Sequence, residues 1–435
     1  MRLFKANENL KVNISLILTS TIIGLYFAEI FFEFHSNDDK VETFNEKKMK
    51  LAKKIGVSYD TRSKFDVIKH LKKSDSKTYF NIYPYLIVES ENNQNDFIKK
   101  ETNKNDNNLY PAFKKLFPLG GISNSTTIFD NELGYYPIIN LDEHGFNNPK
   151  GQYKKKKIDI VLIGDSFVEG YSVGPNESIG SLLRREGLNV VSLGKAGNET
   201  LMEFATLTEY AKLLKPKIVL WFYFRNDLYD LDHFESWKSF PILGKYLSIE
   251  SFTQNLISRQ EEIDSLLINF EDSLAKQTSA KQIIEKENDL KFISRIIKLY
   301  NTRKLIGLYN QNIDQDNVIR NFEGAVSEEA LSIFKLILNK SNSIISSWGG
   351  ELYFIYLPSY DNYKGKTDYY RDFVIRTALS YDIPVIDIKK EIFDKHSNPL
   401  TLFPFGLWGH YNAETYEMIS NRILIKLKNE PVKFN

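Results

Sequence analysis

The second half of the sequence alternates between apolar strand-like runs and amphipathic helical patterns. The runs IDIVLIG (158–164) and KIVLWFYF (217–224) are apolar on both sides of an extended chain, and SEEALSIFKLILNKSNSII (327–345) has helical spacing. Strands that bury both faces and are joined by helices are typical of a parallel sheet covered on both sides. The sequence therefore predicts an α/β fold for this part of the chain.

Composition excludes several classes of function. The chain has 435 residues, of which 57 are basic and 56 acidic, so a net charge of +1 gives no electrostatic reason to expect a nucleic-acid partner. There is no cysteine, which excludes disulfides and thiolate catalysis. The six histidines have no metal-ligand spacing. We therefore expect neither a metal nor a cofactor.

The N-terminus carries an apolar segment, VNISLILTSTIIGLYFA (12–28), which EIFFEF prolongs to residue 34. Its length is at the lower end for a membrane span. Because Arg2, Lys5 and Lys11 precede it, the positive-inside rule places the N-terminus in the cytoplasm. We therefore predict a cytoplasmic tail (1–11), a single transmembrane anchor (12–34) in a bacterial inner membrane, and an extracytoplasmic remainder. The alternatives are a cleaved signal peptide and a buried soluble helix.

Three further regions follow the apolar segment. Residues 35–150 are predicted to form an accessory or lead-in region, or else a partly ordered stalk, and contain one strand-like run, YLIVE (85–89). Residues 151–435 form the predicted α/β domain. Within it, about 234–325 is charged and has helical spacing, which predicts an inserted helical subdomain. The insertion is a set of solvated helices, a cap over a site, or an oligomerisation hairpin.

Chemically useful residues follow the predicted strands. Ser166, Gly197 and Asn226 come after the first three, and His410 lies in the loop after the last. In open parallel sheets, ligands bind beyond the carboxyl ends of the strands. A serine nucleophile needs a base such as histidine, and the oxyanion needs preorganised N–H donors. These residues suit acyl chemistry, but each has a structural alternative: a helix N-cap, a turn glycine, a loop amide and a packed histidine.

Four short blocks resemble the SGNH (GDSL) hydrolase family: GDS, GKAGNET, RND and GHYN. The resemblance implies a flavodoxin-like, three-layer sandwich with a central parallel sheet. It also implies Ser166 as nucleophile, His410 as base, and an oxyanion hole made by the Ser166 N–H, Gly197 and Asn226. The segment GYYPIINLDEHGFNNPKG (134–151) looks like the lead-in of membrane-anchored members associated with bacterial surface polysaccharides.

The sequence departs from that family in two places, of which the smaller is Thr415, where a glycine often stands. The family usually has an aspartate two or three residues before the histidine, but here Leu407 and Trp408 occupy those positions. Either a Ser-His dyad works alone, a backbone carbonyl holds the imidazole, or another acid replaces the aspartate. The candidate acids are Asp387, Asp394 and Asp227.

These features predict a membrane-anchored extracytoplasmic serine esterase or O-acyltransferase. Its expected substrate is an acyl ester, foremost an acetyl ester, of a cell-surface polysaccharide, and its expected partners belong to the polysaccharide biosynthesis machinery. One alternative is a non-catalytic scaffold or glycan-binding component of the same fold. A second alternative is a lipid acylhydrolase.

Overall fold

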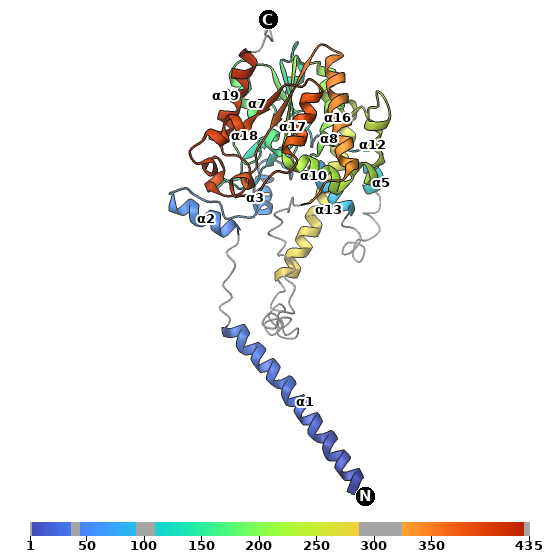
Figure 1. The fold of residues 1–435 in the computed structure, drawn as a ribbon, viewed down its shortest axis with the longest axis vertical. Helices are drawn as coiled ribbons and strands as arrows, with labels where there is room; N and C mark the ends of the chain where they lie inside the picture. The colour runs from blue at the N-terminus through green and yellow to red at the C-terminus, as the bar shows by residue number, and fades with distance from the viewer. Residues whose placement is uncertain (1, 36–43, 93–108, 287–323, 430–435) are drawn as a thin grey trace. The chain divides into compact units, whose positions relative to one another are not determined.

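The computed structural model describes residues 2–35, 44–92, 109–286 and 324–429 (Figure 1). The chain divides into two compact units. The first comprises Met1–Lys47 and Leu274–Asn321, and the second comprises Lys48–Ser273 and Phe322–Asn435. The second unit contains the sheet and all the candidate site residues.

The second unit is built around a five-stranded parallel sheet with the order β4-β3-β5-β6-β7. This is the flavodoxin-like order, in which the first strand of the sheet lies between the second and the third. The predicted α/β fold with a central parallel sheet is thus confirmed. The strands are β3 (Ile160–Ile163), β4 (Val190–Ser192), β5 (Ile218–Tyr223), β6 (Glu351–Tyr356) and β7 (Val385–Asp387).

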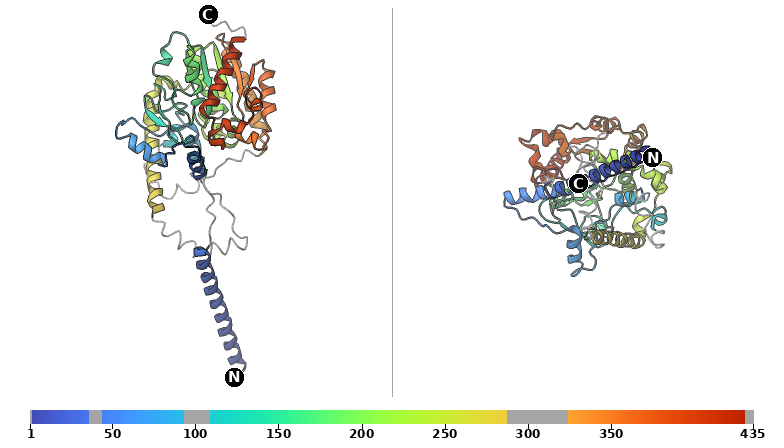
Figure 2. Two further views of the ribbon diagram at one scale, coloured as in Figure 1. Left: turned by 90° about the vertical axis from the view of Figure 1, so that its left-hand side faces the viewer. Right: turned by 90° about the horizontal axis from the view of Figure 1, so that it is seen from below.

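Helices cover both faces of this sheet. Successive side chains of a strand point to opposite faces, so neighbouring residues of β5 contact helices in different layers. On one face, Leu220 is buried in a cluster with Ile419 of α19. On the other, the indole N–H of the next residue, Trp221, donates to Glu203 of α8 at 2.7 Å. The resulting three layers can be followed in Figures 1 and 2. The first face is covered by α7 (Ile179–Arg185) and α19 (Ala413–Asn429). The other face is covered by α8 (Thr200–Thr206), α10 (Arg225–Phe234), α16 (Glu328–Ser346) and α17 (Arg371–Ser380).

Residues before the sheet pack closely on it. Phe129 and Ile139, from a small antiparallel hairpin and its edge, share a buried cluster with Tyr171 and Ala196 of the sheet domain. The run YLIVE, expected to be a strand, is helical, because Pro84 opens the helix with its fixed φ angle. The elements of this region are α2 (Phe44–Lys54), α3 (Lys64–Leu71), α4 (Pro84–Asn92), α5 (Leu109–Phe113), β1 (Thr126–Ile128) and β2 (Ile138–Asn140).

The described part of the region predicted as a helical insertion is mostly helical, with a non-helical stretch at 249–255. It contains α11 (Ser236–Ser239), α12 (Pro241–Ser248) and α13 (Gln260–Lys286). Residues 287–323 lie outside the described residues. The bounds of the insertion stay a prediction.

The apolar N-terminal segment lies in helix α1 (Arg2–His35). Asn13 interrupts the apolar run, and so do hydroxyl side chains at 19–21, which donate to carbonyl oxygens of the preceding turn. Among the residues that the structure describes, none of the helices has the length and apolarity needed to cross a membrane. The expected transmembrane anchor at 12–34 is therefore not found.

Candidate active site

The nucleophile candidate lies at the first position of a short helix, α6 (Ser166–Glu169), directly after the fully buried strand β3. Asp165 caps this helix, because its carboxylate accepts a hydrogen bond from the N–H of Phe167 at 3.0 Å. Burial raises the pKa of Asp165 to about 6. The strand-to-helix turn thus presents the Ser166 hydroxyl at the carboxyl edge of the sheet, where the sequence placed it.

His410 contacts this serine. Its Nε2 lies 2.8 Å from the Oγ of Ser166, within hydrogen-bond distance. The rings of Phe167 and Tyr171 flank the imidazole, with centroids 4.8 and 5.0 Å away. The structure therefore brings together the two residues that the sequence proposed as nucleophile and base, although they are 244 positions apart.

A third residue, which sequence reasoning missed, contacts the far side of the imidazole. The Oε1 of Glu132 lies 2.9 Å from Nδ1 of His410, and its Oε2 accepts the backbone N–H of the same histidine at 2.8 Å. Glu132 lies in the loop between β1 and β2 and is only 8% exposed. A carboxylate at Nδ1 fixes the tautomer with the proton on Nδ1, which leaves Nε2 free to accept the serine proton.

The acids suggested by the sequence are bound elsewhere. Asp387 pairs with Arg371 and caps a short helix after β7. Asp394 pairs with Lys389 at 2.8 Å. Asp227 accepts a backbone N–H at the start of α10 at 2.8 Å. The prediction that one of these three aspartates contacts His410 is therefore wrong. The acid in contact with His410 is Glu132, in the β1–β2 loop of the lead-in region.

One local sign of Glu132 exists beside the histidine. A Cβ atom on Gly409 would lie 2.6 Å from the Oε2 of Glu132. Because real Cβ atoms do not approach an oxygen so closely, the glycine is what allows the carboxylate to reach the backbone N–H of His410. The glycine directly before the histidine is therefore the one feature of the local sequence that is related to this contact.

The charges of the pair support each other. Burial raises the pKa of Glu132, but its attraction to His410, their hydrogen bonds and the charge of Lys48 outweigh burial and bring the pKa to about 2. Burial lowers the pKa of His410, but attraction and hydrogen bonding to Glu132, together with the charges of Asp165 and Asp130, raise it by more, so the pKa lies above its usual 6.5. At neutral pH the carboxylate is therefore ionised and stabilises the imidazolium that forms when His410 takes a proton.

The expected oxyanion donors follow three adjacent strands. Gly197 comes after β4, Ser166 after β3 and Asn226 after β5. Gly197 has φ = 69°, and a Cβ there would lie 2.6 Å from the Cβ of Tyr85, so this turn requires glycine. The Nδ2 of Asn226 donates to Asp230 at 3.1 Å, which uses one of the two N–H bonds of that amide.

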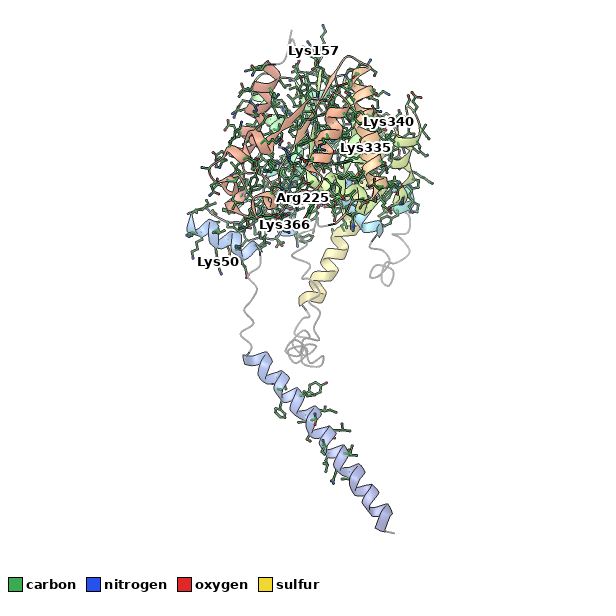
Figure 3. The ribbon with its side chains drawn as sticks, in the orientation of Figure 1. Lys50, Lys157, Arg225, Lys335, Lys340 and Lys366 are labelled. Atoms are coloured by element: carbon green, nitrogen blue, oxygen red, sulfur yellow. The ribbon has the colours of Figure 1, made fainter. Side chains whose placement is uncertain are left out.

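The strand directions place these groups at one edge of the sheet. Figure 3 shows Arg225 and Lys366, which follow β5 and β6, at one end of the unit, and Lys157, which precedes β3, at the other. Within the described ranges, no three His, Asp or Glu side chains are grouped as metal ligands. What the edge does hold is a hydroxyl, a base, a carboxylate and N–H donors, which together can move an acyl group.

No protein-family model and no curated protein matches the chain. Solved structures that are distantly similar include the following three. A lipase/acylhydrolase from Enterococcus faecalis is 14% identical, with 62% of this chain and 96% of that chain covered and a TM-score of 0.34. TesA is 11% identical, with coverages of 62% and 98% and a TM-score of 0.33. LAE5, an alpha/beta hydrolase from the metagenome of Lake Arreo, Spain, is 13% identical, with coverages of 63% and 97% and a TM-score of 0.33. Similarities this distant assign no reaction, which must be inferred from the geometry of the site itself.

Proposed function

We propose that this protein is a serine ester hydrolase or O-acyltransferase. The observation that carries the proposal is the continuous chain of hydrogen-bond contacts from Ser166 through His410 to Glu132. Each member has the partner that its task requires: a base for the hydroxyl, and a carboxylate for the base.

The first half of the reaction forms an acyl-enzyme. Nε2 of His410 takes the proton of Ser166 as Oγ attacks the acyl carbonyl carbon, and Glu132 stabilises the resulting imidazolium. The carbonyl oxygen becomes an oxyanion that accepts hydrogen bonds from the N–H groups of Ser166 and Gly197 and from the Asn226 amide. The intermediate collapses as the imidazolium gives its proton to the leaving alkoxide oxygen, so an alcohol departs.

The second half repeats these steps with a new acceptor. His410 takes a proton from water or from a sugar hydroxyl, whose oxygen attacks the acyl-enzyme. Collapse of the second tetrahedral intermediate returns the proton to Ser166 Oγ. The product is a carboxylic acid if water attacked and a new ester if a sugar hydroxyl did, so the two reactions differ only in the acceptor.

The test is acetate release from a chromogenic acetyl ester by the full chain and by its Ser166→Ala variant. We expect the variant to lose activity by about 10³-fold or more, because removal of the nucleophile disables the whole unit. Assays with an oligosaccharide acceptor, followed by mass spectrometry of the sugar, separate transfer from hydrolysis. A wild type no faster than Ser166→Ala with either acceptor would contradict the proposal.

As substrate we propose an acyl ester, foremost an acetyl ester, of a cell-surface polysaccharide, with partners in polysaccharide biosynthesis and a location outside the bacterial cytoplasm. The support is the resemblance of residues 134–151 to the lead-in of surface-polysaccharide proteins. Release of acetate from an acetylated polysaccharide tests the substrate. Protease accessibility in spheroplasts tests the location.

The geometry disfavours the alternative of a non-catalytic scaffold. The strongest sequence argument for a scaffold was the absence of an acid before His410. Glu132 supplies that acid from another part of the chain, so this argument no longer holds.

A further inference from the structure

A buried ion pair lies next to the candidate site and has no part in the chemistry described above. We propose that Glu169 and Lys195 form a positioning unit that holds the Gly197 loop in register with Ser166, so that their two N–H groups converge on one oxyanion. This proposal rests on the proposed acyl-transfer function. It makes both charged residues positioning residues rather than catalytic ones.

The pair is completely enclosed. Nζ of Lys195 lies 2.9 Å from Oε1 of Glu169, and both side chains are 0% exposed. The second carboxylate oxygen of Glu169 accepts the backbone N–H of Ala196 at 2.9 Å. One carboxylate therefore binds both the side chain and the following backbone of the loop that leads into Gly197.

The pair also joins the two segments that carry the oxyanion donors. Glu169 is the last residue of α6, the helix that begins at Ser166. Lys195 and Ala196 directly precede Gly197 in the loop after β4. A movement of the loop relative to α6 would break at least one of these contacts.

The lead-in region completes the hydrogen bonding of the pair. Oδ1 of Asn81 accepts from Lys195 at 2.7 Å, and its Nδ2 donates to Glu169 at 3.2 Å. The backbone carbonyl of Gly145 is a third acceptor for the lysine, at 3.4 Å. Every charged atom of the pair therefore has a directional partner, which is the condition under which a buried ion pair is tolerated.

Stability alone does not account for such a pair. Removing two charges from water is costly, and apolar residues of similar volume are often as stable or more so. What an apolar pair cannot provide is direction, because the Ala196 N–H needs an acceptor at a fixed place. Oxyanion stabilisation depends strongly on donor position, and a displacement of about 1 Å can cost about 10²-fold in rate.

The test replaces both charges at once, by Glu169→Leu with Lys195→Met in the full chain, so that no unpaired charge is left buried. We expect kcat for the chromogenic acetyl ester to fall about 10- to 100-fold, with KM changed by less than about two-fold. The affinity for butylboronic acid, which forms a tetrahedral adduct with the serine, should fall by a similar factor. A role confined to stability would move neither value in a folded protein.

A matched control removes another ion pair of the same unit. Lys72, the residue directly after α3, binds Glu271 on α13 at 2.9 Å, and Glu271 is 1% exposed. The double variant Lys72→Met with Glu271→Leu makes the same chemical change far along the chain from the site residues. We expect it to leave kcat and the boronate affinity unchanged.

A folded Glu169→Leu/Lys195→Met protein with wild-type kcat and boronate affinity would overturn the proposal. If that protein does not fold, Asn81→Ala takes its place, since it keeps the two charges in contact. A loss of about three- to ten-fold in kcat at constant KM supports the proposal, and an unchanged kcat overturns it.

Hydrogen exchange without substrate separates this proposal from the function on which it rests. We expect the amides of residues 193–199 to exchange at least about ten-fold faster in the altered protein, because the anchor of the Ala196 N–H is lost. Unchanged exchange would overturn the anchoring. If Ser166→Ala is as active as the wild type, the proposed function fails, while the exchange result still stands for the loop.

Discussion

His410 lies between a hydroxyl and a carboxylate, and its pKa is raised above 6.5 because attraction and hydrogen bonding to Glu132, with smaller contributions from Asp165 and Asp130, outweigh burial. The imidazole acts as a base only when neutral, so activity is lost as the pH falls through this raised pKa. We expect the acidic limb of kcat/KM for the acetyl ester to have its midpoint above pH 6.5. In Glu132→Gln, burial remains but the largest attraction is gone, so the limb should move to lower pH. Identical limbs in the two proteins would contradict this assignment.

Gly409 allows the second prediction at this scale. A methyl group at this position would meet the Oε2 of Glu132, which would be 2.6 Å away. We therefore expect Gly409→Ala to displace the carboxylate and to lower kcat by about 10- to 100-fold, with little change in KM. Steady-state kinetics and a melting curve check this. A variant with wild-type kcat would show that the close approach has no bearing on the reaction.

The serine and the histidine could be predicted from the sequence, but the glutamate could not. Ser166 and His410 follow strands, so the sheet itself brings them together. Glu132 lies 278 positions before the histidine and follows no strand of that sheet. A sequence motif points to acids close to the histidine along the chain. The acid that orients the histidine, however, needs only to lie close to Nδ1 in the folded protein.

At the scale of elements, the β1–β2 loop decides where Glu132 lies. The Nδ2 of Asn131 donates to the carbonyl of Asp60 at 2.7 Å, and its Oδ1 accepts the N–H of Gly134 at 2.8 Å. These two bonds fix the loop on both sides of the glutamate. The hydrogen bonds of the loop thus hold Glu132 in position.

We therefore expect Asn131→Ala to lower both stability and turnover. Losing two hydrogen bonds should reduce the free energy of unfolding by about 1–2 kcal/mol, and kcat should fall several-fold while KM is retained. Urea unfolding and ester kinetics measure the two effects. Asn339→Ala, at an exposed position of α16, is the matched control. A loss of stability without any change in kcat would mean that the loop does not position the acid.

The long apolar strands could be predicted because an apolar run flanked by helices in the sequence is typical of a buried parallel strand. β5 and β6 are buried over almost their whole length, and helices flank both in the sequence. The run YLIVE is equally apolar but too short for its periodicity to distinguish a strand from a helix. Its helical conformation depends on Pro84 before it and on the burial of Ile87 and Val88 against neighbours that the sequence does not reveal.

For the molecule as a whole, the proposed catalytic groups and the residues that hold them lie in one unit. Ser166, His410 and Glu132 all belong to the unit that begins at Lys48. We expect a chain started at Phe44 to keep kcat/KM within about three-fold of the full chain, because a compact unit with its own core can fold alone. Ester kinetics on the two proteins measure this. A large loss in the shorter protein would show that α1 contributes to the site.

A chain started at residue 151 gives the opposite expectation. It retains the whole sheet and all four blocks that resemble the family, but it lacks Glu132 and the buried hairpin residues Ile128 and Ile139. We expect this protein to be inactive. The lead-in region would then be a working part of the site rather than an accessory.

The most direct measurement of the central claim compares kcat/KM for the acetyl ester among the wild type, Glu132→Gln and Asp394→Asn. Loss of the carboxylate in a Ser-His-acid unit costs about 10⁴ in turnover, so Glu132→Gln should fall by about 10³- to 10⁴-fold. Asp394 pairs with Lys389, whereas Nδ1 of His410 pairs with Glu132, so Asp394→Asn should stay within about two-fold of the wild type. A Glu132→Gln protein that is folded and fully active would contradict the assignment of Glu132 as the orienting acid. A large loss of kcat/KM in Asp394→Asn but not in Glu132→Gln would contradict it too.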